Sequence, residues 1–373
     1  MSMDDPIVAI ATPVGQGAVS MVRVSGSGCF AVVDKVWQGR STVEQIPARV
    51  ATLGRIYDKD SRLIDEVLLT RFAGSASFTG EDVVELQLHG SVAVVSAVLR
   101  SLGKIEDLRM AEPGEFTRRA MENGKLDLSQ VEGLADLIDA ETESQRRQAQ
   151  EVLSGRLGEL AEKWRVDLIR AASLIEAVID FADEDIPTDV TPEVIGLVEK
   201  VKTDLIAETE GVHIAERIRS GFEVAIVGPP NVGKSTLLNA LAGRDAAITS
   251  EYAGTTRDVI EVRMDLDGLA VTFLDTAGLR ETTDVVEKMG ISLARRRARD
   301  ADLRVVLAGS DEHVDIDLSA DDIRVLPKAD TLEDKGNAVS GLTGEGVDAL
   351  IAKISAVLSS RASGAGLATR LRH

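Results

Sequence analysis

Cysteine and histidine are scarce in this sequence, and their scarcity excludes several kinds of site. The 373 residues include one cysteine, Cys29, and four histidines. One cysteine cannot form an internal disulfide, and a thiol-rich metal site needs several thiolates. We therefore expect neither a disulfide framework nor a zinc site, and we interpret Cys29 as a small buried apolar residue.

Lysine and arginine are also few relative to aspartate and glutamate. Lys and Arg total 42 against 62 Asp and Glu, which gives a formal net charge of −20. Proteins that grip nucleic acid usually neutralise its phosphates with clustered Lys and Arg. The densest basic cluster, Arg295, Arg296, Arg297 and Arg299, falls in an expected helix and is more typical of a solvated helix face. Tight RNA binding without a partner is not expected.

Long apolar runs and a targeting signal are absent too. No run approaches the roughly 20 apolar residues that a membrane helix needs. The first five residues, MSMDD, lack the basic and apolar regions of a signal peptide. We expect a cytoplasmic protein that does not enter a membrane.

The length and the order of expected elements predict a multidomain protein of α+β and α/β type. The first segment mixes strands and helices, the second is strongly helical, and the third alternates strands and helices as a mostly parallel sheet does. In the third segment Asp267-Gly268 marks a hairpin turn. The last segment is a stub that begins an element with nothing to pack against. These four segments are residues 1–127, 128–220, 221–363 and 364–373.

A complete phosphate-loop motif, GPPNVGKST at residues 228–236, lies between an expected strand and an expected helix. Gly228 and Gly233 let the backbone curl, so that its N–H groups converge on a β-phosphate at the positive end of the helix. Lys234 then reaches the β- and γ-phosphates, and Ser235 ligates Mg²⁺. Because the motif is complete and in context, it predicts a nucleoside triphosphate site and not an incidental glycine-rich turn.

Two further segments match the Mg²⁺ and γ-phosphate chemistry of a P-loop GTPase. In the segment DTAG, Asp275 is expected to hold Mg²⁺ through water, and Gly278 to sense the γ-phosphate through its N–H. In the segment GTTRD, Thr256 is the natural second hydroxyl ligand of Mg²⁺, ordered only while the γ-phosphate is present. Without the flanking motifs, Thr255 or Thr256 would be interpreted as a turn residue.

The choice of base is expected in the segment LPKAD, which resembles Asn-Lys-x-Asp but has Pro327 where Asn is usual. Asp330 can accept the N1 and N2 protons of guanine, a pairing that adenine cannot offer, while Lys328 packs over the base. Gly341, after Ser340, supplies a backbone N–H for the guanine carbonyl. These residues favour GTP over ATP, and Pro327 leaves the strictness of that preference open.

Hydrolysis needs an oriented water and a positive charge near the transferred phosphoryl group. The residue after DTAG is Leu279, which cannot orient water as the glutamine of Ras-type enzymes does. Glu287 is the best substitute on chemistry, although an acidic residue in a helix is usually only a solvated face. The charge can come from Arg257, from Arg280 or from a monovalent cation held near Asn231.

Taken together, the phosphate loop, GTTRD and DTAGLR resemble the TrmE-type branch of translation GTPases, whose G domain is Ras-like. The rest of the chain is similar, in order and spacing, to the family of tRNA modification GTPases called MnmE or TrmE. The blocks that carry this resemblance are IVAIATPVGQG at 7–17, VRVSG at 22–26, SFTGEDVVE at 77–85, LHG at 88–90, AEPGEFTR at 111–118, GKLDL at 124–128 and DFADEDI at 180–186.

The resemblance implies a function in tRNA modification. Members of the family work with the flavoprotein MnmG, in a heterotetramer, to install an aminomethyl or carboxymethylaminomethyl group at C5 of the wobble uridine of certain tRNAs. The tRNA would then be bound mainly through the partner, which agrees with the acidic charge. The N-terminal domain would bind 5-formyl- or methylene-tetrahydrofolate and form the homodimer. Arg23, Glu85 and Lys125 match the family's folate contacts; without the resemblance we would interpret them as a surface salt-bridge set.

The resemblance also implies K⁺-dependent hydrolysis, in which two G domains pair and the cation replaces an arginine finger. Ser235 and Thr256 would ligate Mg²⁺, and Glu287 would orient the water, with Thr256 and Lys234 as the other catalytic residues. The K⁺ contacts would be Asn231, Ser250, Tyr252 through its backbone, and Thr255. The GTP contacts would be Asn231, Val232, Gly233, Lys234, Ser235, Thr236, Ser250, Glu251, Tyr252, Ala253, Gly254, Thr255, Thr256, Asp275, Thr276, Ala277, Gly278, Lys328, Asp330, Ser340 and Gly341.

Departures from the family pattern leave alternatives. Family members continue into a second helical stretch and end in Cys-x-Gly-Lys, whereas this sequence ends at His373, by nature or by truncation. We expect GTP chemistry here, while modification activity is in doubt. One rival is a regulatory GTPase switch in ribosome assembly without tRNA chemistry; a weaker one is a folate-binding scaffold with a degenerate G domain. Affinity of residues 1–127 for 5-formyltetrahydrofolate separates the first rival from the family function.

Overall fold

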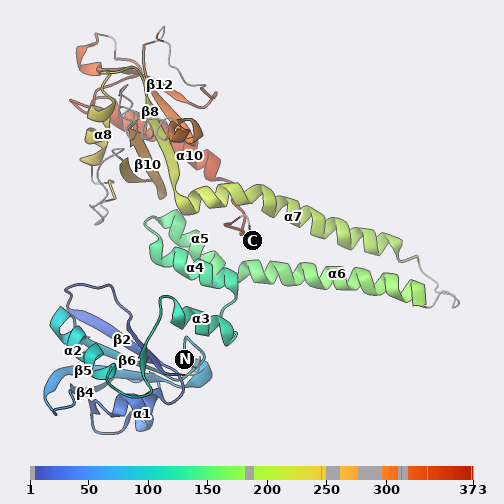
Figure 1. Ribbon diagram of the computed structural model, residues 1–373. Helices are drawn as coiled ribbons and strands as arrows, with labels where there is room; N and C mark the ends of the chain where they lie inside the picture. Colours follow the sequence, from blue (N-terminus) through green and yellow to red (C-terminus); the bar gives the residue numbers. More distant parts are fainter. Residues whose placement is uncertain are drawn as a thin grey trace, which may run out of the picture. The chain divides into compact units, whose positions relative to one another are not determined.

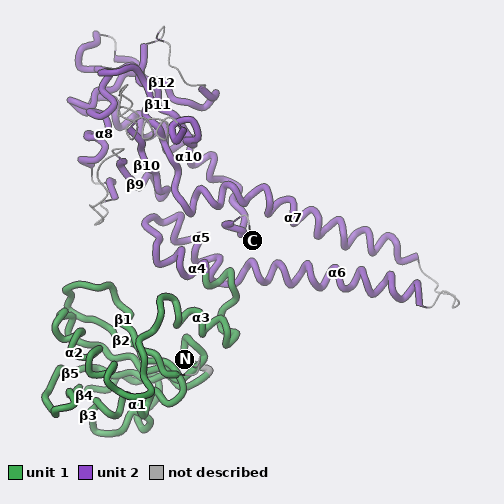
Figure 2. Tube along the Cα trace, in the orientation of Figure 1, with its two compact units in different colours: residues 1–131 green, residues 132–373 purple. Residues whose placement is uncertain are grey.

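The computed structural model describes residues 5–180, 189–244, 246–248, 261–275, 296–309, 312, 318–333, 335–370 and 372. The chain divides into two compact units, residues 1–131 and 132–373, which Figure 2 shows in different colours. Each unit has its own β-sheet, as the multidomain fold class predicts.

The sheet of the first unit has the strand order β3-β4-β5-β6-β2-β1-β7. Neighbouring strands are antiparallel except β1 and β7, which are parallel. Alternating apolar residues of β2 (Val22, Val24) and β6 (Val84, Leu86, Leu88) are buried, a pattern typical of a sheet with one covered face. The strands are β1 (Ile7–Ile10), β2 (Val19–Ser25), β3 (Trp37–Gln38), β4 (Thr52–Tyr57), β5 (Leu63–Phe72), β6 (Val83–His89) and β7 (Arg109–Met110).

Helices α1 and α2 pack on this sheet and complete its core (Figure 1). In α2 the buried residues Val95, Val98 and Leu102 recur at helical spacing and so lie on one face. Cys29, at the start of α1, is buried, which confirms its interpretation, and burial raises the pKa of its thiol to about 12. The helical elements are α1 (Cys29–Asp34), α2 (Val92–Leu102), α3 (Glu115–Glu122), η1 (Val43–Gln45) and η2 (Gly74–Ala76).

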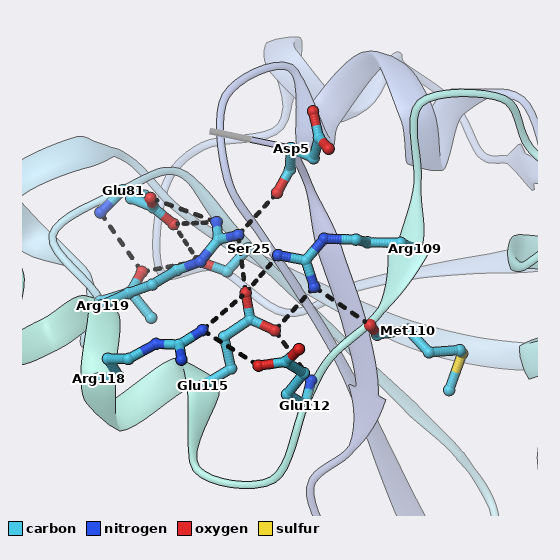
Figure 3. A network of polar contacts seen from close by, with 10 residues as sticks. Asp5, Ser25, Glu81, Arg109, Met110, Glu112, Glu115, Arg118 and Arg119 are labelled. Atoms are coloured by element: carbon cyan, nitrogen blue, oxygen red, sulfur yellow. Dashed lines mark hydrogen bonds and ion pairs between the residues drawn. The ribbon is translucent and has the colours of Figure 1, made fainter. Parts of the chain in front are cut away.

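Helix α3 is held to β7 by a network of buried charges (Figure 3). The carboxylate of Glu115 accepts from both terminal nitrogens of Arg109, at 2.8 and 2.5 Å, and from Nη2 of Arg119 at 3.2 Å. Arg119 also donates to Glu81 at 3.1 Å and to the carbonyl of Asp5 at 2.8 Å. The hydrogen bond from Arg109 is the main reason why the pKa of Glu115 falls to about 2.

The second unit begins with helices, as expected for residues 128–220. The two long helices α6 and α7 lie side by side and run in opposite directions (Figure 1). Lys200 of α7 donates to Asp167 of α6 at 2.7 Å. Within the described residues, none of the helices has the length and apolarity that membrane crossing requires. The helices are α4 (Leu128–Asp139), which begins in the first unit, α5 (Glu143–Leu153), α6 (Arg156–Asp180) and α7 (Thr191–Ser220).

The sheet that follows has the order β13-β12-β11-β8-β10-β9 and is parallel except for the β9–β10 hairpin. This confirms the mostly parallel sheet. The predicted hairpin turn is also confirmed, because Asp267 and Gly268 have φ of 51° and 87°, the positive values that a tight two-residue turn requires. The elements are β8 (Phe222–Val227), α8 (Lys234–Ala242), β9 (Glu261–Leu266), β10 (Leu269–Asp275), β11 (Leu303–Leu307), β12 (Ile323–Pro327), η3 (Ala329–Thr331), β13 (Ala338–Val339) and α10 (Val347–Ala362).

The segment after α10 packs on the helices, in contrast to the expected stub without a partner. The N–H of Leu367 donates to Glu208 of α7 at 2.8 Å, and Arg370 pairs with Asp136 of α4 at 2.8 Å. A Cβ on Gly211 would lie 2.3 Å from the backbone nitrogen of Gly366, so a glycine on α7 makes room for the crossing chain. These partners lie more than 150 residues away in the sequence, which is why local patterns did not reveal them.

Candidate nucleotide-binding site

Four segments that carry predicted site residues follow the carboxyl ends of β8, β10, β12 and β13. Parallel strands present these ends along one edge of a sheet, where ligands of open α/β sheets bind. β8 is paired with β10 on one side and with β11 on the other, so the phosphate loop leaves the middle of the sheet. The fold thus gathers those predicted phosphate, Mg²⁺ and base residues that the structure describes at one edge.

The phosphate loop has the backbone conformation that its glycines allow. Gly228 has φ of 154°, and a Cβ there would lie 2.3 Å from the carbonyl oxygen of Leu307. Gly233, which caps the N-terminus of α8, has φ of 114°. Asn231 has φ of 59° and an exposed side chain, while Val232 packs against the core. The loop therefore turns into the amino end of α8, where backbone N–H groups are available to an anion.

Lys234 is held against the phosphate loop. Its Nζ donates to the carbonyl oxygens of Gly228 at 2.8 Å and Pro229 at 2.9 Å, and the residue is 6% exposed. Burial lowers the pKa of Lys234, and the charge of Asp275 opposes this shift. A buried ammonium at the amino end of a helix adds to the positive potential there, which favours a phosphate ligand.

Ser235 and Asp275 form the core of a possible Mg²⁺ site. The hydroxyl of Ser235, on the first turn of α8, donates to Oδ2 of Asp275, the last residue of β10, at 2.8 Å. Hydroxyl and carboxylate oxygens are hard donors of the type that Mg²⁺ prefers, usually together with water and nucleotide phosphates. The two residues thus offer donor atoms that fit a magnesium ion.

The residues predicted to read the base lie in the loops that follow β12 and β13. Asp330 is exposed, and its pKa is lowered mainly by a hydrogen bond with the buried side chain of Ser340. Lys328 precedes it with a left-handed φ of 60° and is also exposed. A Cβ on Gly341 would lie 2.5 Å from the backbone nitrogen of Leu237 in α8. The base loop therefore packs directly on the helix that begins at the phosphate loop.

Leu342 is a neighbour of this site that sequence reasoning missed. It follows Gly341 and is 79% exposed. Its only sequence signal is an apolar residue within the polar loop SGLTGEG, and neither exposure nor position can be derived from that pattern alone.

Thr236, on the first turn of α8, has an exposed side chain. Many other predicted site residues lie outside the described residues. Those outside include the alternatives for positive charge, Arg257 and Arg280, and also Leu279. The site residues in this group are Ser250, Glu251, Tyr252, Ala253, Gly254, Thr255, Thr256, Thr276, Ala277, Gly278 and Glu287.

The three residues matched to folate contacts lie in the first unit. Arg23 and Glu85 are directly opposite on β2 and β6, and Nη2 of Arg23 donates to Oε1 of Glu85 at 2.7 Å. The guanidinium also lies over the rings of Phe78 and Phe116, 5.7 and 5.8 Å from their centroids. Lys125 is exposed in the turn after α3. The structure therefore pairs Arg23 with Glu85 and places the guanidinium of Arg23 over two aromatic rings.

Comparisons with known proteins cover nearly the whole chain. The family model for the GTP-binding protein TrmE N-terminus matches residues 6–125, and the MnmE helical domain model matches residues 128–373. A "tRNA modification GTPase MnmE" of Ruegeria pomeroyi is 60% identical over 369 residues, which cover 99% of this chain and 85% of that protein. Its namesake in Ruegeria sp. strain TM1040 is 59% identical with the same coverage.

Among solved structures, Aquifex aeolicus Era bound to GDP and AlF4⁻ matches 36% of this chain and 56% of its own at 28% identity. Its TM-score of 0.27 is too low to support a statement about the fold.

Proposed function

Because this chain belongs to the MnmE family of tRNA modification GTPases, we propose that it binds and hydrolyses GTP at the carboxyl edge of its second sheet. It does so as part of tRNA modification. The observation that carries this proposal is the joint placement of Lys234, the Ser235–Asp275 pair and Gly341 at α8. A triphosphate and a guanine base need these groups at one edge, and no other cluster of described residues offers them.

The chain's own residues supply binding and positioning. Backbone N–H groups of the phosphate loop and Lys234 neutralise the β- and γ-phosphates, and Asp330 accepts the N1 and N2 protons of guanine. Ser235, together with Asp275 and the proposed ligand Thr256, would hold Mg²⁺, which neutralises charge that develops on the phosphate oxygens. Glu287 is proposed to orient the attacking water, because Leu279 has no group that can do so.

We propose the finer family properties for this chain as well. K⁺ would be held by Asn231, Ser250, Tyr252 and Thr255 when two G domains pair in a homodimer. The exposed Asn231 in its left-handed conformation is the one described member of this set and supports the proposal. A flavoprotein partner of the MnmG type would supply most of the tRNA contacts, because a net charge of −20 disfavours direct binding.

The first unit is proposed to bind a formyl- or methylene-tetrahydrofolate. Arg23 offers a cation to the glutamate tail of a folate, and Phe78 and Phe116 offer rings for its pterin. Saturable binding of 5-formyltetrahydrofolate by the full chain supports this function over a ribosome-assembly switch, which has no use for the ligand. Absence of binding removes the folate proposal.

Steady-state GTP hydrolysis in K⁺ and in Na⁺ tests the catalytic proposal. We expect turnover to rise at least about tenfold in K⁺, because the cation stabilises transition-state charge. Glu287→Ala is expected to abolish turnover while the affinity for GDP stays within about twofold of wild type. Glu312→Ala is the control, because Glu312 is an exposed acidic residue of the same unit. This variant should keep wild-type turnover.

Equal turnover in both salts would remove the cation from the mechanism and point to Arg257 or Arg280 as the source of positive charge. Full activity of Glu287→Ala would show that another group orients the water.

A further inference from the structure

The arginine cluster that the sequence predicts to be a solvated helix face has one member that binds the second sheet. Arg296 and Arg299 are exposed, as expected, whereas the side chain of Arg297 is 33% exposed and contacts two carboxylates. Its Nη2 donates to Oε1 of Glu223 at 2.7 Å, and its Nη1 donates to Oε1 of Glu261 at 2.5 Å. The proposed nucleotide chemistry gives Arg297 no role.

The two carboxylates lie on strands that are not neighbours. Glu223 is on β8, Glu261 is the first residue of β9, and β10 lies between these strands. The guanidinium thus reaches across β10 from the helical residues 296–300, whose Ala298 belongs to the same buried cluster as Ala225 of β8. Arginine can hold both carboxylates at once, because its planar fork donates from several nitrogens.

Glu261 lies at the end of the ladder between β9 and β10. Its partner on β10 is Leu274, and the next residue, Asp275, accepts the hydroxyl hydrogen of Ser235 in the proposed Mg²⁺ site. β9 is an edge strand of the described sheet, and the last pair of a ladder opens more readily than pairs in its interior. The ion pair with Arg297 holds this last pair closed, one residue away from Asp275.

The magnitudes favour a role of this contact in positioning over a role in stability. Ion pairs between partly exposed side chains contribute little to the free energy of unfolding. A displacement of about 1 Å in a catalytic arrangement, in contrast, can lower a rate by about a hundredfold. A contact that fixes the strand end beside Asp275 therefore affects hydrolysis more than it affects folding.

We propose that Arg297 is a positioning residue for GTP hydrolysis, which holds the end of β9 so that Asp275 stays aligned with Ser235 at the Mg²⁺ site. This inference rests on the proposed GTPase function and adds a residue that touches neither the nucleotide nor the metal. Loss of Arg297 weakens the use of Mg²⁺ and slows the chemical step. The phosphate loop keeps its affinity for GDP, because its own contacts are unchanged.

Steady-state GTP hydrolysis by the full chain over a range of Mg²⁺ concentrations tests this inference with Arg297→Ala. We expect kcat to fall about tenfold and the half-maximal Mg²⁺ concentration to rise at least about threefold, because Asp275 is less well aligned. The GDP affinity measured without Mg²⁺ and the unfolding temperature should stay close to wild type. Glu261→Gln should reproduce both kinetic changes, and the double variant should add little to either, because the two residues act through one contact.

Arg296→Ala is the matched control, because it removes the same charge at the preceding position, where the side chain is exposed. It should leave kcat, the Mg²⁺ dependence and the GDP affinity unchanged. If the wild type hydrolyses no GTP, the proposed function itself fails. If the wild type is active and Arg297→Ala keeps its kcat and Mg²⁺ dependence, or loses activity only together with GDP affinity and thermal stability, the positioning role is wrong.

Discussion

Asp330 has the properties of a carboxylate prepared to read a base. Its pKa is lowered, mainly by a hydrogen bond with Ser340, which favours the ionised carboxylate. Pro327 offers neither an N–H nor a polar side chain, so the proposed guanine selection rests on Asp330 and on the backbone of Gly341.

Asp330→Asn should therefore reverse the base preference. An amide cannot accept two protons from guanine, but it can donate one to the 2-carbonyl of xanthine. We expect GDP affinity to fall about a hundredfold, since hydrogen bonds to a charged group are worth roughly 1.5–3 kcal/mol each. Affinity for XDP should rise. Competition binding of the two nucleotides measures this change, and an unaltered GDP preference would assign base selection elsewhere.

The sequence predicts individual site residues where a motif fixes their chemical role. Lys234, Ser235 and Asp275 follow from spacing, and their short contacts agree with the roles assigned to them. The exposure of Leu342, in a loop closed by Ser340, does not follow from spacing, because it is seen only in the folded chain.

The packing of helix α3 against its neighbours relies on buried ion pairs more than on apolar contacts. Glu115 and Arg119 on this helix are 2% and 3% exposed, and they are balanced by Arg109 and Glu81. Removing one member of a buried, hydrogen-bonded pair leaves an uncompensated charge, which typically costs about 3–5 kcal/mol.

We expect Glu115→Gln to lower the free energy of unfolding by about 3 kcal/mol at neutral pH. The pKa of Glu115 is about 2 in the folded protein against an ordinary value of 4.5. A lowered folded-state pKa stabilises the protein above the unfolded value and loses this effect as pH falls. The difference between wild type and variant should therefore shrink as pH falls from about 4.5 toward about 2.

Urea unfolding at several pH values measures this difference. Glu112→Gln is the matched control, because its side chain is 68% exposed and its contact with Arg118 is 3.4 Å long. A Glu115→Gln variant as stable as this control at neutral pH would contradict the role of the buried network.

Local signals predicted many elements of this chain well. The side chain of Ser91 accepts a hydrogen bond from the N–H of Val94 and so caps α2, as serine commonly does at the start of a helix. The buried charges around Glu115 were not foreseen, because burial of an ion depends on partners from β7 and from the loop at Glu81.

In the whole molecule, the second unit ties its sheet to its helices at several points. The turn of the β9–β10 hairpin reaches α5, where the N–H of Ser144 donates to the carbonyl of Gly268 at 3.1 Å. In the same region Arg263 of β9 pairs with Glu141 at 2.9 Å. Strand β9 of this hairpin follows the segment with Thr255 and Thr256 in the sequence, and strand β10 ends at Asp275. The hairpin therefore connects residues of the proposed nucleotide site to the helices.

The expected domain bounds stay predictions, and long-range packing follows from no local pattern. The expected boundary after residue 127 lies close to the division after residue 131. Residues 364–370 pack on α7 and α4 through contacts with Glu208 and Asp136. No local sequence pattern predicts these contacts.

Equilibrium binding of labelled GDP to the full chain in millimolar Mg²⁺ tests the central claim most directly. We predict saturable binding by the wild type, at least about a hundredfold weaker binding by Lys234→Ala because a charge-assisted phosphate contact is lost, and no effect of excess ATP. Binding that does not saturate, or that is the same in Lys234→Ala, would contradict a guanine nucleotide site at the head of α8.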